Sequence, residues 1–164
     1  MGSLVNQNIV EQIVTNCRDF EHLIEKNWGF VNKRATKEYL AFLMWCATSM
    51  LQNNEAGKEE LDDFHRSFYK RMALEGLLQA GEQLEYEELS RERYMQFFFE
   101  LGEGNLDAKK LNALVAKEAL HIENILQPKN NHKEDILGEL YPFLFATFNG
   151  LMRGIQLLFV PEAG

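Results

Sequence analysis

Acid–histidine pairs are the first feature of this sequence that could do chemistry. Three of the four histidines follow an acidic residue by three positions: Asp19 and His22, Asp62 and His65, and Glu118 and His121. Residues three apart share one face of an α-helix, and Glu-x-x-His is half of a di-metal carboxylate site in ferritin-like bundles. The spacing therefore raises a metal site as one hypothesis, with His65, Glu118 and His121 as its ligands.

The directions of these pairs weaken the metal hypothesis. At about 100° per residue, Asp19 and His22 point away from the apolar side of their predicted helix. A di-metal site also needs one further inward acid from each of two other helices, and we find none in the first two predicted helices. We therefore expect no metal and no other cofactor, and we keep the metal site only as an alternative.

Polar residues also interrupt the apolar stripes of the predicted helices. They are His65, Glu75, Arg93 and Glu118, with His121 at the flank of its stripe. A buried carboxylate without a partner is strongly penalised, so Glu118 must pair, become protonated or face water in a cavity. The main expectation is an interhelical ion pair such as Glu118 with Arg93. The alternative is a polar pocket in which these five residues orient a small, partly apolar ligand.

Two further features favour contacts with another protein. Three consecutive phenylalanines on one helix cannot all face the same way, so Phe99, or Phe98 and Phe99 together, should reach a second surface, which Met95 extends. Gly150 and Gly154 lie one turn apart and would let another helix approach closely. An apolar patch with a charged rim is a common basis for protein contacts. These residues predict a homo-oligomer or a protein partner.

Apolar spacing and breaks in it predict six helices. They are expected near residues 6–26, 36–52, 58–79, 86–101, 105–126 and 133–159. Thr36 is the expected N-cap of the second helix, Gly81 the expected stop of the third, and Pro142 should kink or divide the last one. The run "YLAFLMWCATSML" is apolar nearly all round, which predicts a central second helix.

The fold class that follows is all-α. We expect residues 1–164 to form one domain, a compact bundle or sandwich of about six helices, and a globin-like layout also fits the order of helix lengths. A chain of 164 residues with twelve phenylalanines, five tyrosines and two tryptophans can build a real core.

Charge and targeting signals exclude several classes of protein. The formal net charge is −8, and the nearest basic cluster holds only Lys33, Arg34 and Lys37, so we expect no nucleic-acid partner. Arg153 interrupts the apolar stretch at residues 142–160, so we expect a core helix there and no membrane span. Isolated cysteines and the absence of a secretory signal favour the cytoplasm.

The sequence contains no signature of a known catalytic site. We find no nucleophile elbow, phosphate-binding loop, dinucleotide fingerprint or His-Glu-x-x-His motif, and we lean against an enzyme. The leading hypothesis is a small cytoplasmic regulatory or adaptor domain that acts through protein contacts and self-associates. The alternatives are a sensor that binds a small, partly apolar ligand between helices, and a metal-binding bundle.

Overall fold

The computed structural model describes residues 4–101, 108–126 and 133–158; the side chains of residues 98–101, 108, 133–137 and 155–158 are outside this description. The described residues form six α-helices and one short 3₁₀ turn. They are α1 (Leu4–Trp28), α2 (Lys33–Asn53), α3 (Lys58–Leu74), η1 (Ala80–Glu82), α4 (Gln83–Leu101), α5 (Ala108–Leu126) and α6 (Lys133–Leu158). The predicted all-α bundle of about six helices is confirmed.

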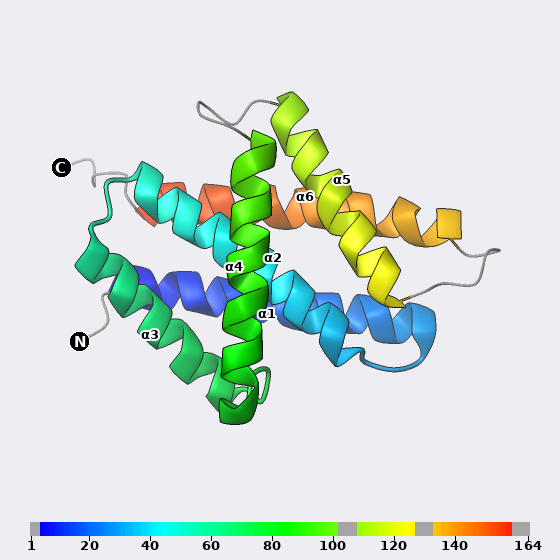
Figure 1. Cartoon of the computed structure of the whole chain (residues 1–164), viewed down its shortest axis with the longest axis horizontal. Helices are drawn as coiled ribbons and strands as arrows, with labels where there is room; N and C mark the ends of the chain where they lie inside the picture. The colour runs from blue at the N-terminus through cyan, green and yellow to red at the C-terminus, as the bar shows by residue number, and fades with distance from the viewer. Residues whose placement is uncertain (1–3, 102–107, 127–132, 159–164) are drawn as a thin grey trace.

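Helix α2 lies at the centre of the molecule. It contacts α1 and α6 on one side and α4 and α5 on the other, while α3 packs mainly against α1. Figure 1 shows α4 crossing in front of α2 at a steep angle, with α1 and α6 running behind it. The layout is therefore a sandwich with α2 as its middle layer, as its nearly continuous apolar surface predicts.

Aromatic side chains from five helices, α1, α2, α3, α4 and α6, fill the core. The rings of Phe20 and Tyr39 stack with centroids 4.4 Å apart, and Trp45 meets Phe97 edge-on at 5.3 Å. The Tyr39 hydroxyl is hydrogen-bonded to the hydroxyl of Thr147 on α6 at 2.7 Å, so this buried polar group is satisfied. Aromatic packing and one matched hydrogen bond together hold α1, α4 and α6 on the central helix.

Two predicted helix boundaries are wrong, and both errors come from capping. Asn32, not Thr36, caps α2, because its side-chain oxygen accepts a hydrogen bond from the Ala35 amide at 3.1 Å. Helix α3 ends at Leu74 because Gly76 adopts φ +71°, and the amides of the next two residues then bond back to the Met72 carbonyl. Glu75 therefore lies at the end of α3 and not within it.

Helix α6 continues through Pro142 as one helix, so of the two predicted effects of the proline, a kink or a division, the division does not occur. Proline removes the backbone hydrogen bond to the residue four positions earlier, which here is Gly138. Gly138 is exposed, so water can satisfy the carbonyl that loses its partner. No helix within the described residues is both long enough and apolar enough to cross a membrane.

Replacing Pro142 by alanine should stabilise the protein. Pro142 is exposed, and its replacement by alanine restores one helical hydrogen bond. Proline costs about 3 kcal/mol relative to alanine inside a helix. We expect the free energy of unfolding to rise by about 1–3 kcal/mol, measured by urea denaturation followed by circular dichroism. An unchanged or lower urea midpoint would contradict this expectation, because it would show that proline at position 142 does not destabilise α6.

Candidate functional site

A groove of about 870 Å³ lies between α3 and α4. In Figure 1 the end of α3 meets the start of α4 and the two helices diverge from there, with α2 passing behind α4. The floor comes from α2 and includes Met44 and Thr48, both almost fully buried, and the walls include Leu61 and Tyr94. Helix α3 packs mainly against α1, and it meets the start of α4 where the rings of Tyr69 and Tyr86 lie with centroids 6.0 Å apart.

Two polar contacts stand inside this groove. The Thr48 hydroxyl lies 3.4 Å from Nε2 of His65, and the Tyr94 hydroxyl donates a hydrogen bond to the Gln52 side-chain oxygen at 3.1 Å. Burial lowers the pKa of His65, although the carboxylate of Asp62 acts in the opposite direction. A lowered pKa favours the neutral ring at pH 7, which suits the partly buried position of His65 beside Thr48.

Charged and flexible side chains edge the groove. Lys58 and Asp62 stand on the α3 side, and Glu87 and Arg91 on the α4 side. Met95 also borders the groove, and its side chain is 54% exposed. Of the predicted residues, the groove thus contains His65 from the ligand set and Met95 from the interface set.

A second polar group lies inside the core, where α2, α4 and α5 meet. Arg93 on α4 binds Glu38 on α2 with both ends of its guanidinium: Nε is 2.6 Å from Oε1 and Nη2 is 3.1 Å from Oε2. Glu38 is only 1% exposed, so this is a buried bidentate ion pair. Our expectation that the first two helices carry no inward acid is therefore wrong.

Glu118 on α5 completes this group, which we call the buried carboxyl cluster (Glu38, Arg93 and Glu118). Glu118 is fully buried, and within the described part of the chain neither of its oxygens receives a hydrogen bond. Burial raises the pKa of Glu118 well above its ordinary value and the nearby Glu38 raises it further, whereas Arg93 lowers it. The expected Glu118–Arg93 ion pair does not form, because Arg93 binds Glu38 instead.

His121 lies beside the buried carboxyl cluster. Its Nε2 donates a hydrogen bond to the side-chain oxygen of Gln96 on α4 at 2.9 Å. The pKa of His121 is lowered, first by burial and then by the charge of Arg93. Arg93, Glu118 and His121 are thus brought together by the fold, whereas His65 lies in the groove on another helix.

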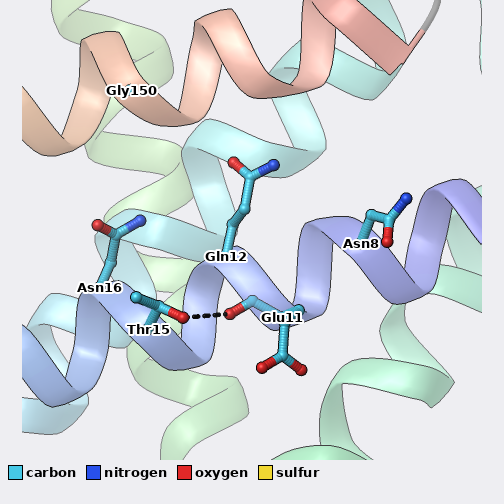
Figure 2. A pocket seen from close by; sticks show the side chains of 6 residues that line it. All are labelled: Asn8, Glu11, Gln12, Thr15, Asn16 and Gly150. Carbon is cyan, nitrogen blue, oxygen red and sulfur yellow. Dashed lines mark hydrogen bonds between the residues drawn. The ribbon is translucent and has the colours of Figure 1, made fainter.

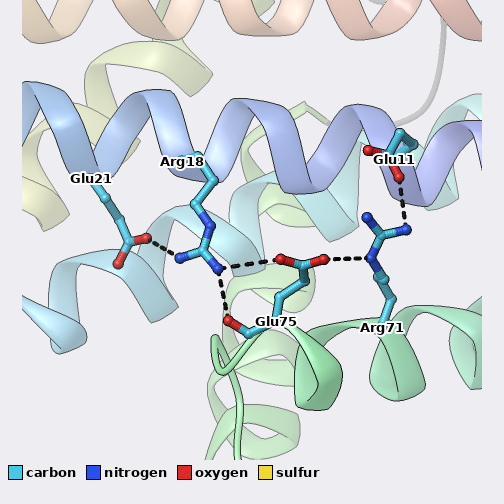
Figure 3. Close-up of polar contacts among 5 residues, drawn as sticks. All are labelled: Glu11, Arg18, Glu21, Arg71 and Glu75. Carbon is cyan, nitrogen blue, oxygen red and sulfur yellow. Dashed lines mark hydrogen bonds and ion pairs between the residues drawn. The ribbon is translucent and has the colours of Figure 1, made fainter.

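Glu75 lies far from both groups of residues, in a surface network between α1 and α3. Its carboxylate sits between Arg18 and Arg71, with Oε1 2.9 Å from Nε of Arg71 (Figure 3). Arg71 also reaches Glu11 at 2.7 Å, and Arg18 reaches Glu21 at 2.9 Å. Hydrogen bonds from Arg71 and Arg18 lower the pKa of Glu75, so its role is that of a surface ion pair.

The two glycines predicted at an interface have different surroundings. A side chain at Gly154 would overlap the side-chain amide of Gln12, which would have to move, so Gly154 faces α1 within the chain. Gly150 is exposed, faces open space and borders a shallow hollow of about 530 Å³ along α1. Figure 2 shows Gln12 and Asn16 pointing from α1 toward α6 in this hollow. The predicted Phe98 and Phe99 side chains lie outside the described residues.

Comparison with known proteins adds no functional information. No protein-family model matches the chain, and no curated protein or solved structure matches it. Within the described residues, no group of three or more histidines, cysteines or acids stands in a metal-binding arrangement. The chemistry of the site therefore rests on its own geometry.

Glu38 is the residue of the buried cluster that sequence reasoning missed. A signal for it was present, because Glu38 lies one turn before Phe42 in a helix that is apolar nearly all round. A charged residue in such a helix has no solvated face to occupy, so it must be buried with a partner. The identity of that partner depends on how α4 crosses α2.

Breaking the Glu38–Arg93 pair should strongly destabilise the fold. The substitution Arg93→Met keeps most of the apolar stem but leaves Glu38 buried and unpaired, which costs about 3–5 kcal/mol. Urea denaturation should show this loss, and the double variant Glu38→Met/Arg93→Met should recover much of it because no unpaired charge remains.

The matched control for this experiment is Arg71→Met. Arg71 forms two ion pairs, but they are at the surface, so we expect a much smaller change in the urea midpoint. Equal losses in Arg93→Met and Arg71→Met would contradict the structural role that we assign to the buried pair.

Proposed function

We propose that this protein is a helical interaction domain that binds an amphipathic helical segment of a partner protein in the groove between α3 and α4. The observation that carries the proposal is an open groove whose lining surface is mostly apolar and whose edges carry charges of both signs. Helix-in-groove binding is a common mode of peptide recognition. The two free cysteines, Cys17 and Cys46, are both buried, and we place such a domain in the cytoplasm.

The floor and the walls of the groove support this mode of binding. Met44 and Met95 are unbranched and flexible, so they can adapt to an apolar side chain inserted between α3 and α4. Tyr69 and Tyr94 offer rigid aromatic surface with a polar end, a combination enriched at protein interfaces. Met95 is the most exposed of these side chains, so its burial by a bound segment would contribute most to binding.

The rim favours a helical segment over a compact apolar molecule. Lys58 and Asp62 on one wall and Glu87 and Arg91 on the other can pair with charges that flank the apolar stripe of a helix. A small apolar molecule has no charges that could pair with these four side chains. The volume of about 870 Å³ also suits a small ligand, which we keep as the competing occupant.

A peptide library tests this proposal directly. Random 16-residue peptides displayed on phage are selected on the wild-type protein, and the recovered peptides are measured by fluorescence polarisation. We expect sequences with apolar residues at positions i, i+3 or i+4 and i+7. The variant Met95→Glu should weaken their binding by roughly tenfold or more, because it places a charge against the apolar stripe.

The matched control is Leu120→Glu. Leu120 is 50% exposed, close to the 54% of Met95, but it lies on α5, which does not line the groove. Binding should be unchanged in this control. Peptides that bind both variants equally, or a library that yields none, would overturn the proposal. Small fragments that shift the NMR signals of His65 and Tyr94 while no peptide binds would favour the competing ligand-sensor function.

Self-association is a second candidate activity, and the surroundings of Gly150 favour it. The hollow beside Gly150 is lined mostly by uncharged side chains of α1, including Asn8, Gln12 and Asn16. The charge of Glu11, at the same hollow, is already bound by Arg71. Two copies of a chain with net charge −8 repel each other, so a face with few charges suits a dimer contact best.

Two glycine variants test self-association. We expect the wild-type protein to be a dimer at about 100 µM by size-exclusion chromatography with light scattering, and Gly150→Leu to be monomeric. Gly138→Leu is the control, because Gly138 is also an exposed glycine of α6 with open space around it. A monomeric wild-type protein, or a dimer that survives Gly150→Leu, would exclude this contact.

A further inference from the structure

The carboxyl group of Glu118 enters the core from α5 and meets the ion pair that joins α2 to α4. It is fully buried, and no described residue donates a hydrogen bond to it. The Glu38 carboxyl lies within hydrogen-bonding reach of it. A buried polar group that lacks a partner costs free energy, so a fold that keeps Glu118 here needs a way to satisfy it.

A proton on Glu118 resolves this problem. Two ionised carboxylates can only accept hydrogen bonds, so they cannot satisfy each other. Arg93 already directs Nε and Nη2 to Glu38. A protonated Glu118 can instead donate to Glu38, and the buried carboxyl cluster then holds one negative and one positive charge.

We propose that Glu118 carries a proton in the folded protein and uses it to donate a hydrogen bond to the Glu38 carboxylate, so that this hydrogen bond fastens α5 to the central helix and loss of the proton releases α5. Release would uncover the apolar face of α5, whose buried members include Leu114, Val115 and Ile122. The device acts independently of the groove, because α5 contributes no residue to it.

Ionisable groups from each helix around Glu118 define the pH range of the test. Helix α2 provides Glu38 and Cys46, α4 provides Arg93, and α5 itself provides His121. The described ionisable side chains of α6 are Glu139, Tyr141 and Arg153, and none of them is among the groups that act on Glu118.

The test uses the range from about pH 7 to about pH 8.5, which lies above the ordinary pKa of histidine and below that of a buried thiol. The pKa of His121 lies below its ordinary 6.5, and burial raises the pKa of Cys46 well above 9.0. Glu118 has a raised pKa when α5 is docked and its ordinary value near 4.5 when α5 is released. The docked state therefore binds more protons, and its stability falls as pH rises toward the raised pKa.

Amide hydrogen exchange followed by mass spectrometry tests the proposal. After correction for intrinsic exchange rates, the opening constant of α5 peptides should rise with pH in this range, approaching tenfold per pH unit. The variant Glu118→Gln should remove this pH dependence, because its amide donates to Glu38 without an ionisable proton. Glu88→Gln, at an exposed position of α4, should leave the dependence intact.

Peptides from α1 provide the internal reference. Their protection should change little with pH over the same range, since α1 holds no member of the buried carboxyl cluster. A wild-type α5 whose opening constant is independent of pH would overturn the proposal, as would a pH dependence that survives Glu118→Gln. Equal loss of protection in α1 and α5 would also overturn it, because the proton would then stabilise the whole fold without fastening α5.

Discussion

Burial of α2 on nearly every side is the constraint on which the rest of the structure depends. A helix with no solvated face must find partners inside the protein for each polar group that it carries. Glu38 receives Arg93 from α4, Tyr39 meets Thr147 from α6, and Thr48 contacts His65 from α3. The apolar surface of α2 drives association, whereas these polar groups select which residue of each neighbouring helix lies against it.

Helix α4 links the core to the surface because its two faces have different tasks. Arg93 points to Glu38 inside the molecule, and the next two residues, Tyr94 and Met95, line the groove. The bidentate ion pair therefore sets the rotation of α4 about its own axis, since a turned helix would break both hydrogen bonds. The same interaction determines which side chains of α4 line the groove.

Apolar periodicity predicted the helices, the central place of α2 and the anomaly at Glu118, because periodicity directly reflects which face is buried. It failed where the outcome depends on tertiary contacts. The partner of Arg93 depends on how α4 crosses α2, so Glu38 was missed. Glu75 was assigned to a stripe that ends before it, since Gly76 stops α3. The rule that proline divides a helix failed at Pro142, because the carbonyl of the exposed Gly138, which loses its backbone partner there, can bond to water.

The ion pair between Glu38 and Arg93 also has an evolutionary consequence. Replacing either residue alone leaves a buried charge without a partner, so sequence drift must cross a destabilised intermediate to change the pair. We expect related chains to keep both residues or to replace both with apolar ones. Position 118 is less constrained, because glutamine can donate the same hydrogen bond there. We therefore expect glutamate and glutamine to interchange at position 118, whereas residues 38 and 93 should change together.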